Sequence, residues 1–323
     1  MDVPAWVWFA TVGGLAVLFA LELVIVERTP HEMGLAEAAR WVVFSLACAA
    51  VFGLGVWRFA GGDFAVKYFA GYLTEYSLSV DNLFLFVVIM TAFRVPTIRQ
   101  HRVLAVGVAL ALVMRGGFIA AGATLISHFS WVFYFFGVLL VYLGARQLCQ
   151  RRQNVQLREN IVLRAFRKLT PGASKRQFTP IIVVMIAIGS VDVVFALDSI
   201  PAIFGLTHEP FLVFTANAFA LMGLRQIYFI IGRLLTRLVY LSVGLGVILS
   251  FIGVKLVLDA LHENALPFLN EGRPLHSVPT VGSKLSLGVI VGVLLVTTVA
   301  SVLRTRRHRR GSQPARQEII SPK

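Results

Sequence analysis

The sequence predicts an all-α membrane protein, a polytopic bundle of about nine transmembrane helices that includes two inverted three-helix repeats. Three observations lead to this fold class. Hydrophobic residues make up 57% of the 323 residues and charged residues only 14%, whereas soluble domains contain about 25% charged residues. Apolar runs long enough to cross a bilayer recur along the whole chain. Similar acidic segments recur in two of these runs.

Each apolar run has about the 20 residues that a helix needs to cross a bilayer. The runs fall at about residues 4 to 26, 39 to 57, 68 to 91, 103 to 126, 131 to 149, 179 to 203, 211 to 231, 238 to 258 and 284 to 303. The predicted organisation is therefore two first helices (1–62), repeat 1 (63–150), a basic cytoplasmic loop (151–178), repeat 2 (179–260), an outer loop (261–283), a last helix (284–303) and a basic cytoplasmic tail (304–323).

The basic residues predict the orientation of the chain. Of the 30 Lys and Arg, 23 fall in the connections after the first, third, fifth and seventh runs and in the C-terminal tail. Only three fall in the connections after the second, fourth, sixth and eighth runs. Cytoplasmic loops hold the excess of basic residues, so we expect the N-terminus outside and the C-terminus in the cytoplasm. A net charge of +14 suggests a nucleic-acid partner in a soluble chain, but basic runs directly beside spans favour contact with anionic lipid.

The third and sixth runs contain matching polar segments. In residues 75–84 a Glu is followed after five residues by Asp81 and Asn82, and in residues 192–201 an Asp is followed after five residues by Asp198 and Ser199. The match continues with an arginine in each of the following runs. Because the two runs cross the membrane in opposite directions, runs 3 to 5 and 6 to 8 are predicted to be inverted repeats, an arrangement typical of secondary transporters.

Four acids lie well inside the predicted spans, and each costs about 2.5 to 3.5 kcal/mol at the bilayer centre. Such a cost favours a functional role, with buried ion pairs as the structural alternative. The predicted site has Glu75, Asp81, Asn82, Asp192, Asp198 and Ser199 as metal ligands, Arg115 and Arg225 as charge-balancing groups and Pro201 as a helix break.

The ligand types limit the substrate. Carboxylate, amide, hydroxyl and carbonyl oxygens suit hard divalent cations such as manganese, magnesium or calcium. None of the seven histidines lies in a span interior, so a site of imidazole and thiolate ligands is not expected. Protonation of buried, mutually repelling carboxylates offers a route to exchange of the cation for protons.

The segments E-Y-S-L-S-V-D-N-L-F at 75–84 and F-A-L-D-S-I-P-A-I-F-G-L-T at 195–207 resemble the two signature segments of the TerC family of bacterial integral membrane proteins. The resemblance implies a multi-pass inner-membrane protein related to lysine-exporter-like transporters. It also implies a link to tellurium resistance and, in some branches of the TerC family, to manganese efflux. A cavity lined by carboxylates repels the tellurite oxyanion, so an indirect effect through metal homeostasis fits the residues better.

The sequence therefore predicts a transporter that exports a divalent cation, with manganese the first choice, from the cytoplasm. We expect the lipid bilayer, the metal ion and protons as partners, no permanently bound cofactor and no enzymatic activity. One alternative is a non-transporting membrane component of a metal or tellurite stress-response complex. Another is an intramembrane aspartyl protease, against which the inverted repeat and the presence of four acids rather than two argue.

Overall fold

The computed structural model describes residues 3–28, 34–93, 95–129, 131–149, 184–185, 188–189, 199–234, 240–262, 275 and 278–311. Within these residues the only regular secondary structure is helical. The helices are α1 (Ala5–Arg28), α2 (Leu35–Ala60), α3 (Gly62–Ala92), α4 (Thr97–His128), α5 (Val132–Cys149), α8 (Pro210–Leu221), α9 (Leu224–Leu234), α10 (Leu241–His262) and α11 (Ser283–Gly311). Residues 199–204 form one more helical segment. The predicted all-α class is confirmed.

Among the described residues, five segments are long and apolar enough to cross a membrane. They are Ala36–Ala60, Val103–Ile126, Val132–Cys149, Leu241–His262 and Ser283–Arg304. Two shorter apolar helices, Ala5–Leu21 and Pro210–Leu221, fall in the first and seventh predicted spans. The protein is thus an integral membrane protein by its helices, whereas the number of nine spans stays a prediction.

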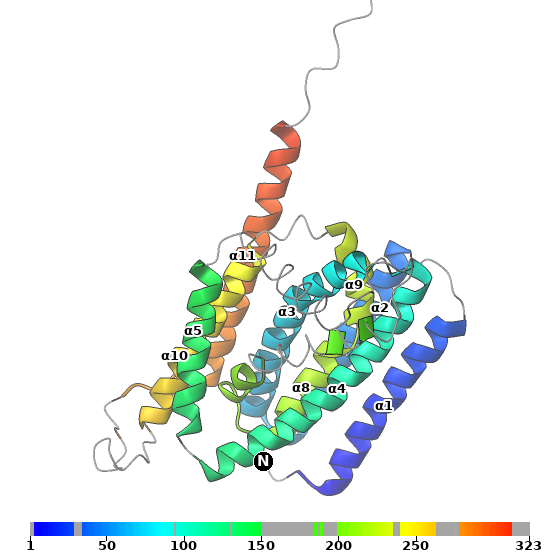
Figure 1. Ribbon diagram of the computed structural model, residues 1–323. Helices are drawn as coiled ribbons and strands as arrows, with labels where there is room; N and C mark the ends of the chain where they lie inside the picture. The colour runs from blue at the N-terminus through cyan, green and yellow to red at the C-terminus, as the bar shows by residue number, and fades with distance from the viewer. Residues whose placement is uncertain are drawn as a thin grey trace, which may run out of the picture.

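Exposed apolar side chains cover the outside of the bundle, as expected for a surface that faces lipid. Three exposed tryptophans lie at helix ends: Trp6 near the start of α1, Trp57 near the end of α2 and Trp131 just before α5. Tryptophan is enriched at membrane interfaces. The orientation predicted from the basic residues would put all three positions on the outer side. In Figure 1 the N-terminus lies at one end of the bundle and α11 leaves at the other.

Helices α5 and α10 pack closely through pairs of glycines. A Cβ atom on Gly137 would lie 3.0 Å from the carbonyl oxygen of Gly253, and one on Gly144 would lie 2.6 Å from that of Gly246. These two pairs run in opposite directions along the two helices, so α5 and α10 are antiparallel. Small residues allow membrane helices to approach this closely without a larger side chain between them.

Helix α3 lies at the centre of the bundle. Helices α5, α10 and α11 lie on one side of it, and α2, α4, α8 and α9 lie on the other, as Figure 1 shows. Helix α1 packs on the second group, where Trp8 makes an edge contact with Phe211 at the start of α8, with ring centroids 5.0 Å apart. The long central helix thus contacts both halves of the described chain.

The seventh predicted span is not one continuous helix. It is divided into α8 and α9 by a turn at Met222 and Gly223. Gly223 has a φ of +85°, a conformation that other L-residues rarely adopt. A Cβ atom there would lie 2.9 Å from Ser45 Oγ of α2. By contrast, α3 is continuous, although the serines of residues 75–84 offer its backbone alternative hydrogen bonds.

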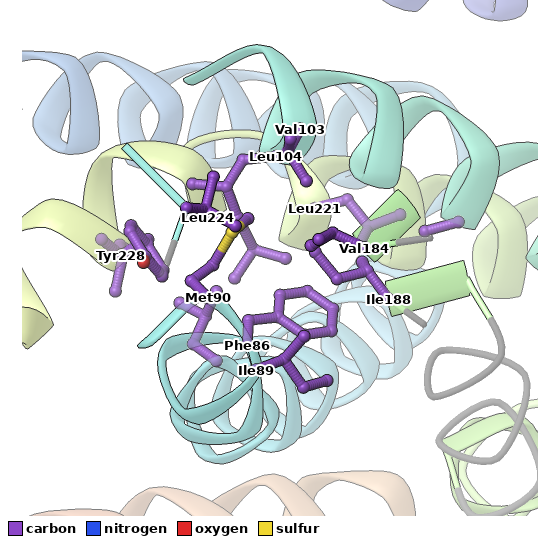
Figure 2. Close-up of a cluster of buried hydrophobic side chains, with 14 residues drawn as sticks. Phe86, Ile89, Met90, Val103, Leu104, Val184, Ile188, Leu221, Leu224 and Tyr228 are labelled. Atoms are coloured by element: carbon purple, nitrogen blue, oxygen red, sulfur yellow. The ribbon is translucent and has the colours of Figure 1, made fainter. Parts of the chain in front are cut away.

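Three clusters of buried apolar side chains, one distal and two proximal, fill the two ends of the half of the bundle that contains α2, α4, α8 and α9. The distal cluster lies away from the N-terminus and consists of Leu83, Phe86, Ile89, Met90, Val95, Val103, Leu104, Ala111, Val184, Ile188, Leu221, Leu224, Ile227 and Tyr228 (Figure 2). The proximal clusters lie toward the N-terminal end; one includes Leu15, Tyr68, Tyr72, Phe211 and Phe219, and the other consists of Ile119, Ile200, Ile203, Phe204 and Val213.

Candidate functional site

A buried charged group lies at the junction of α3, α4 and α8. The carboxylate of Glu75 forms an ion pair with the guanidinium of Arg115, and the two side chains are 0% and 2% exposed. Arg115 Nη1 also donates a hydrogen bond of 3.2 Å to Oδ1 of Asn217. A lone buried charge is very costly in an apolar medium, so this pairing explains how Glu75 and Arg115 can both lie at this depth.

Small residues bring the three helices together at this point. A Cβ atom on Gly71 of α3 would lie 3.6 Å from the Ala216 side chain of α8. One on Gly116 of α4 would lie 3.6 Å from the ring of Phe214, also on α8. These contacts lie within one or two turns of Glu75, Arg115 and Asn217, so close backbone approach places the three polar side chains within reach of one another.

Further polar atoms are buried around this group without a hydrogen-bond partner among the described residues. They include the hydroxyl of Tyr72, Oγ of Ser79 and Nδ2 of Asn217. Tyr72, Glu75 and Ser79 are spaced by three and four residues, so they lie on one face of α3. By contrast, Ser77 uses its hydroxyl to bond the Leu73 carbonyl at 2.6 Å. The face of α3 with Glu75 is thus a polar stripe with unused hydrogen-bonding capacity.

Along α3 and α4 the charged group lies between the apolar clusters. Along α3, Glu75 lies between Tyr72 of a proximal cluster and Leu83 of the distal cluster. Along α4, Arg115 lies between Ala111 of the distal cluster and Ile119 of a proximal one. Among the described residues, the polar groups at the centre are therefore flanked along α3 and α4 by packed apolar side chains toward both ends.

The structure describes only some of the predicted ligands. Asp81 and Asn82 lie on α3, but their side chains are outside the described part, as is that of Arg225 on α9. Asp192 and Asp198 are wholly outside the described residues. The described side chains contain no group of three or more His, Cys, Asp or Glu that could hold a metal ion.

The helical segment 199–204, which follows Asp198, packs against α3 near the charged group. Ser199 is 0% exposed, and its hydroxyl has no hydrogen-bond partner among the residues described. Pro201 was predicted to break the helix just after Asp198 and Ser199, but it lies within the helical segment 199–204, so the described residues show no break at Pro201 itself. Ile203 of this segment lies 3.5 Å from a Cβ atom built on Gly71. The segment thus packs directly against α3, one turn from Glu75.

Lys255 is an intramembrane charge to which the sequence assigned no role. Its Nζ donates to the carbonyl oxygen of Gly205 at 3.1 Å and pairs with Asp259 Oδ2 at 2.7 Å. Gly205 follows the helical segment 199–204, whose last carbonyls lack helical partners. The lysine therefore fixes the end of the segment that begins beside Asp198. The spacing of Lys255 and Asp259 on one helix was a signal for this pair.

Arg115, which is also hydrogen-bonded to Asn217, can neutralise and hold the Glu75 carboxylate at the centre of the helix bundle. Because Arg115 compensates Glu75, this acid adds no net charge in the present arrangement. A cation that used Glu75 as a ligand would share the carboxylate with the guanidinium or displace it. Asn217 offers Arg115 an alternative acceptor, so the pair could separate without leaving the arginine unbonded.

Comparison with known proteins shows the family of this chain. The sequence model of the family described as integral membrane protein TerC matches residues 60–309. An uncharacterized membrane protein of Mycobacterium tuberculosis H37Rv is 46% identical over 323 residues, which cover 95% of this chain and 81% of the relative. The Alx protein of Escherichia coli K12, named as a candidate membrane-bound redox modulator, is 33% identical over 326 residues, covering 94% and 95%. No solved structure matches the chain.

Proposed function

We propose that this chain, which belongs to the TerC family of integral membrane proteins, exports a divalent metal cation from the cytoplasm across the bacterial inner membrane, with manganese the preferred ion. The observation behind the proposal is the buried Glu75 and Arg115 pair, covered by apolar clusters toward both ends of the bundle. A polar centre closed on both sides is the arrangement expected of a transporter between its two open states.

The acids of the two matching segments complete the proposed site. Asp81 follows Glu75 on α3, and Asp198 directly precedes the buried Ser199. Ser199 begins the helical segment whose Ile203 packs against Gly71 of α3. Oxygen ligands of this kind suit Mn²⁺, Mg²⁺ and Ca²⁺ rather than softer ions. Proton exchange supplies the driving force in this proposal. Resistance to tellurium would follow indirectly, through metal homeostasis.

The test is metal transport by the purified full chain in inside-out vesicles, where export becomes uptake. We expect Mn²⁺ uptake that is lost in Asp81→Asn and in Asp198→Asn, although both variants insert into the membrane normally. Asp63→Asn is the matched control, because Asp63 is an exposed acid at the start of α3. Normal Mn²⁺ transport by both site variants would contradict the assignment, and so would uptake of only Zn²⁺ or Ni²⁺ by the wild-type protein.

A second candidate function is a non-transporting membrane component of a metal-stress or tellurite-stress complex, in which the acids only form structural ion pairs. The compensation of Glu75 by Arg115 is the observation that favours it. An exchanged pair, Glu75→Arg with Arg115→Glu, separates the two functions. Structural pairing predicts that the exchanged pair still restores metal or tellurite tolerance to a deletion strain, whereas a cation site predicts that tolerance and transport are both lost.

The name of the Alx relative raises redox chemistry as a further question. The present chain has two cysteines, Cys48 on α2 and Cys149 at the end of α5, and neither is in a disulfide. Thiol redox chemistry between paired cysteines is therefore not what we propose for this chain. The aspartyl protease is not what we propose either, because the two matching segments supply four acids rather than two; the aspartates it would use lie outside the described side chains.

A further inference from the structure

Asn217 is the polar side chain through which α8 bonds to another helix. Helix α8 has two polar side chains, Thr215 and Asn217, in an otherwise apolar sequence. Thr215 uses its hydroxyl on the Phe211 and Leu212 carbonyls of its own helix, whereas Oδ1 of Asn217 accepts the bond from Nη1 of Arg115 on α4. A guanidinium has donors and no acceptor, so only the amide oxygen can face it. The side chain of Asn217, which is 1% exposed, is therefore oriented toward a cation.

The nitrogen of the same amide has no such role. Nδ2 of Asn217 is buried and has no hydrogen-bond partner among the described residues. A buried donor without a partner costs free energy, and an alanine, such as those at positions 216 and 218, would avoid this cost. The asparagine at position 217 is therefore explained by its oxygen, which gives the guanidinium a second acceptor beside Glu75.

The two acceptors of Arg115 are unequal. The Glu75 carboxylate forms an ion pair with the guanidinium, whereas the Asn217 amide is neutral. The bond to Asn217 is 3.2 Å, at the long end of the range for N–H···O bonds. In a medium of low dielectric constant, two opposite charges attract more strongly than a charge and a neutral amide. The guanidinium therefore favours Glu75 unless another cation competes for that carboxylate, and its bond to Asn217 can shorten if it moves away.

A divalent cation at Glu75 would be such a competitor. The cation and the guanidinium are both positive, and like charges repel strongly at a few ångströms when water does not screen them. Both side chains of the ion pair are almost fully buried. Repulsion thus favours displacement of Arg115 over sharing of the carboxylate, and Asn217 keeps the displaced arginine hydrogen-bonded.

We propose that Arg115 is a built-in substitute for the transported cation, which neutralises Glu75 when no metal is bound and moves to Asn217 when the metal takes the carboxylate. This inference rests on the proposed function and deepens it by naming the group that balances Glu75 in the metal-free carrier. Asn217 is a positioning residue, because it acts through Arg115. A buried carboxylate without a partner is strongly destabilising, so the substitute allows the metal-free carrier to return between its open states.

Mn²⁺ binding to the purified full chain tests this movement, with the EPR signal of free Mn²⁺ as the measure of the Kd. We expect Asn217→Leu to raise the Kd at least about tenfold, the scale of one hydrogen bond to a charged group, because the displaced guanidinium lacks its acceptor. Arg115→Met should lower the Kd, because the metal no longer competes with the guanidinium. The double variant should bind as Arg115→Met does, since Asn217 acts only through the arginine. Thr215→Val is the matched control, because Thr215 bonds its own helix, and it should leave the Kd unchanged.

Transport of radioactive Mn²⁺ in proteoliposomes gives a measurement that a purely structural role would not change. Exchange of Mn²⁺ for Mn²⁺ across the membrane needs only the metal-bound carrier, whereas net transport also needs the metal-free carrier to return. We expect Arg115→Met to lower the ratio of net transport to exchange at least about tenfold, because its metal-free form has an uncompensated Glu75. A loss of stability alone lowers both rates in proportion.

Several outcomes would overturn the proposal. These are an unchanged Kd in Asn217→Leu, a change of the same sign in Asn217→Leu and Arg115→Met, or a proportional loss of exchange and net transport in Arg115→Met. If Arg115→Met does not insert into the membrane, the Kd of Asn217→Leu against that of Thr215→Val decides, because Asn217→Leu keeps the Glu75 and Arg115 pair. A wild-type chain that binds Mn²⁺ without moving it would contradict the proposed function, and the Kd values would still decide whether Arg115 gives way to the metal. Absence of Mn²⁺ binding by the wild-type chain would overturn both.

Discussion

Removing one partner of the Glu75 and Arg115 pair should destabilise the protein much more than removing both. Arg115→Met leaves a carboxylate that is 0% exposed with no counter-ion, and Glu75→Gln leaves a guanidinium that is 2% exposed. Breaking a buried pair in this way costs about 3 to 5 kcal/mol, whereas replacing both partners by uncharged groups is about neutral. The hydrogen bond from Arg115 to Asn217 stays in Glu75→Gln, so the loss there should fall at the lower end of this range.

The four proteins of this double-mutant cycle would be purified in one detergent and unfolded by denaturant, with helical content and tryptophan fluorescence as two probes. We expect a coupling free energy of at least about 2 kcal/mol, because the double variant Glu75→Gln, Arg115→Met should recover most of the stability lost in each single variant. The pair Lys67 and Asp63 is the control on the same helix. Their charged atoms are 2.9 Å apart, but the side chains are 27% and 63% exposed, so removing Asp63 should cost no more than about 1 kcal/mol.

Additive losses in the cycle, or a coupling no larger than that of Lys67 and Asp63, would refute the argument that the buried pair is held together by the cost of an uncompensated charge. The same variants separate stability from function. A double variant that is stable but does not transport would show that Glu75 or Arg115 acts in transport beyond holding the fold together.

Three further predictions concern packing, a buried lysine and topology. Gly144→Ala places a methyl group 2.6 Å from the Gly246 carbonyl oxygen, so it should lower the free energy of unfolding by about 1 to 3 kcal/mol. Gly55→Ala is the control, because it has open space around it and should not lower the stability. The denaturant midpoints of unfolding check both variants. Lys255→Met should cost about 1 to 3 kcal/mol by leaving the carbonyl it binds without a donor, and an unchanged unfolding curve would contradict this. Cys149 is exposed at the end of α5 and should react with a membrane-impermeant maleimide only after the cells are permeabilised; reaction in intact cells would reverse the predicted orientation.

The class of the protein was determined by the sequence alone. Composition and the repeated apolar runs predicted an all-helical membrane protein, and the five span-forming helices and the family match confirm it. The reason is that the bilayer imposes simple rules of length and hydrophobicity on every crossing segment. The cost of a buried charge likewise marked Glu75 and Arg115 as unusual before any contact was known.

Only the tertiary structure decided which groups meet. Glu75, Arg115 and Asn217 are separated by 40 and 102 residues along the chain, and no local pattern gives the distance between side chains on three different helices. For the same reason Lys255 could not be matched to the carbonyl of Gly205 from spacing, although its bond to that carbonyl fixes the end of the segment beside Asp198.

The position of the helix break also depended on tertiary contacts. Helix α3 is continuous, with helices packed on both sides of it, although the serines in residues 75–84 offer its backbone alternative hydrogen bonds. The seventh predicted span is divided at Met222 and Gly223, where Ser45 of α2 packs so closely that a Cβ atom on residue 223 would lie 2.9 Å from its Oγ. A glycine inside an apolar run permits a break, but whether the chain uses it depends on what packs against it.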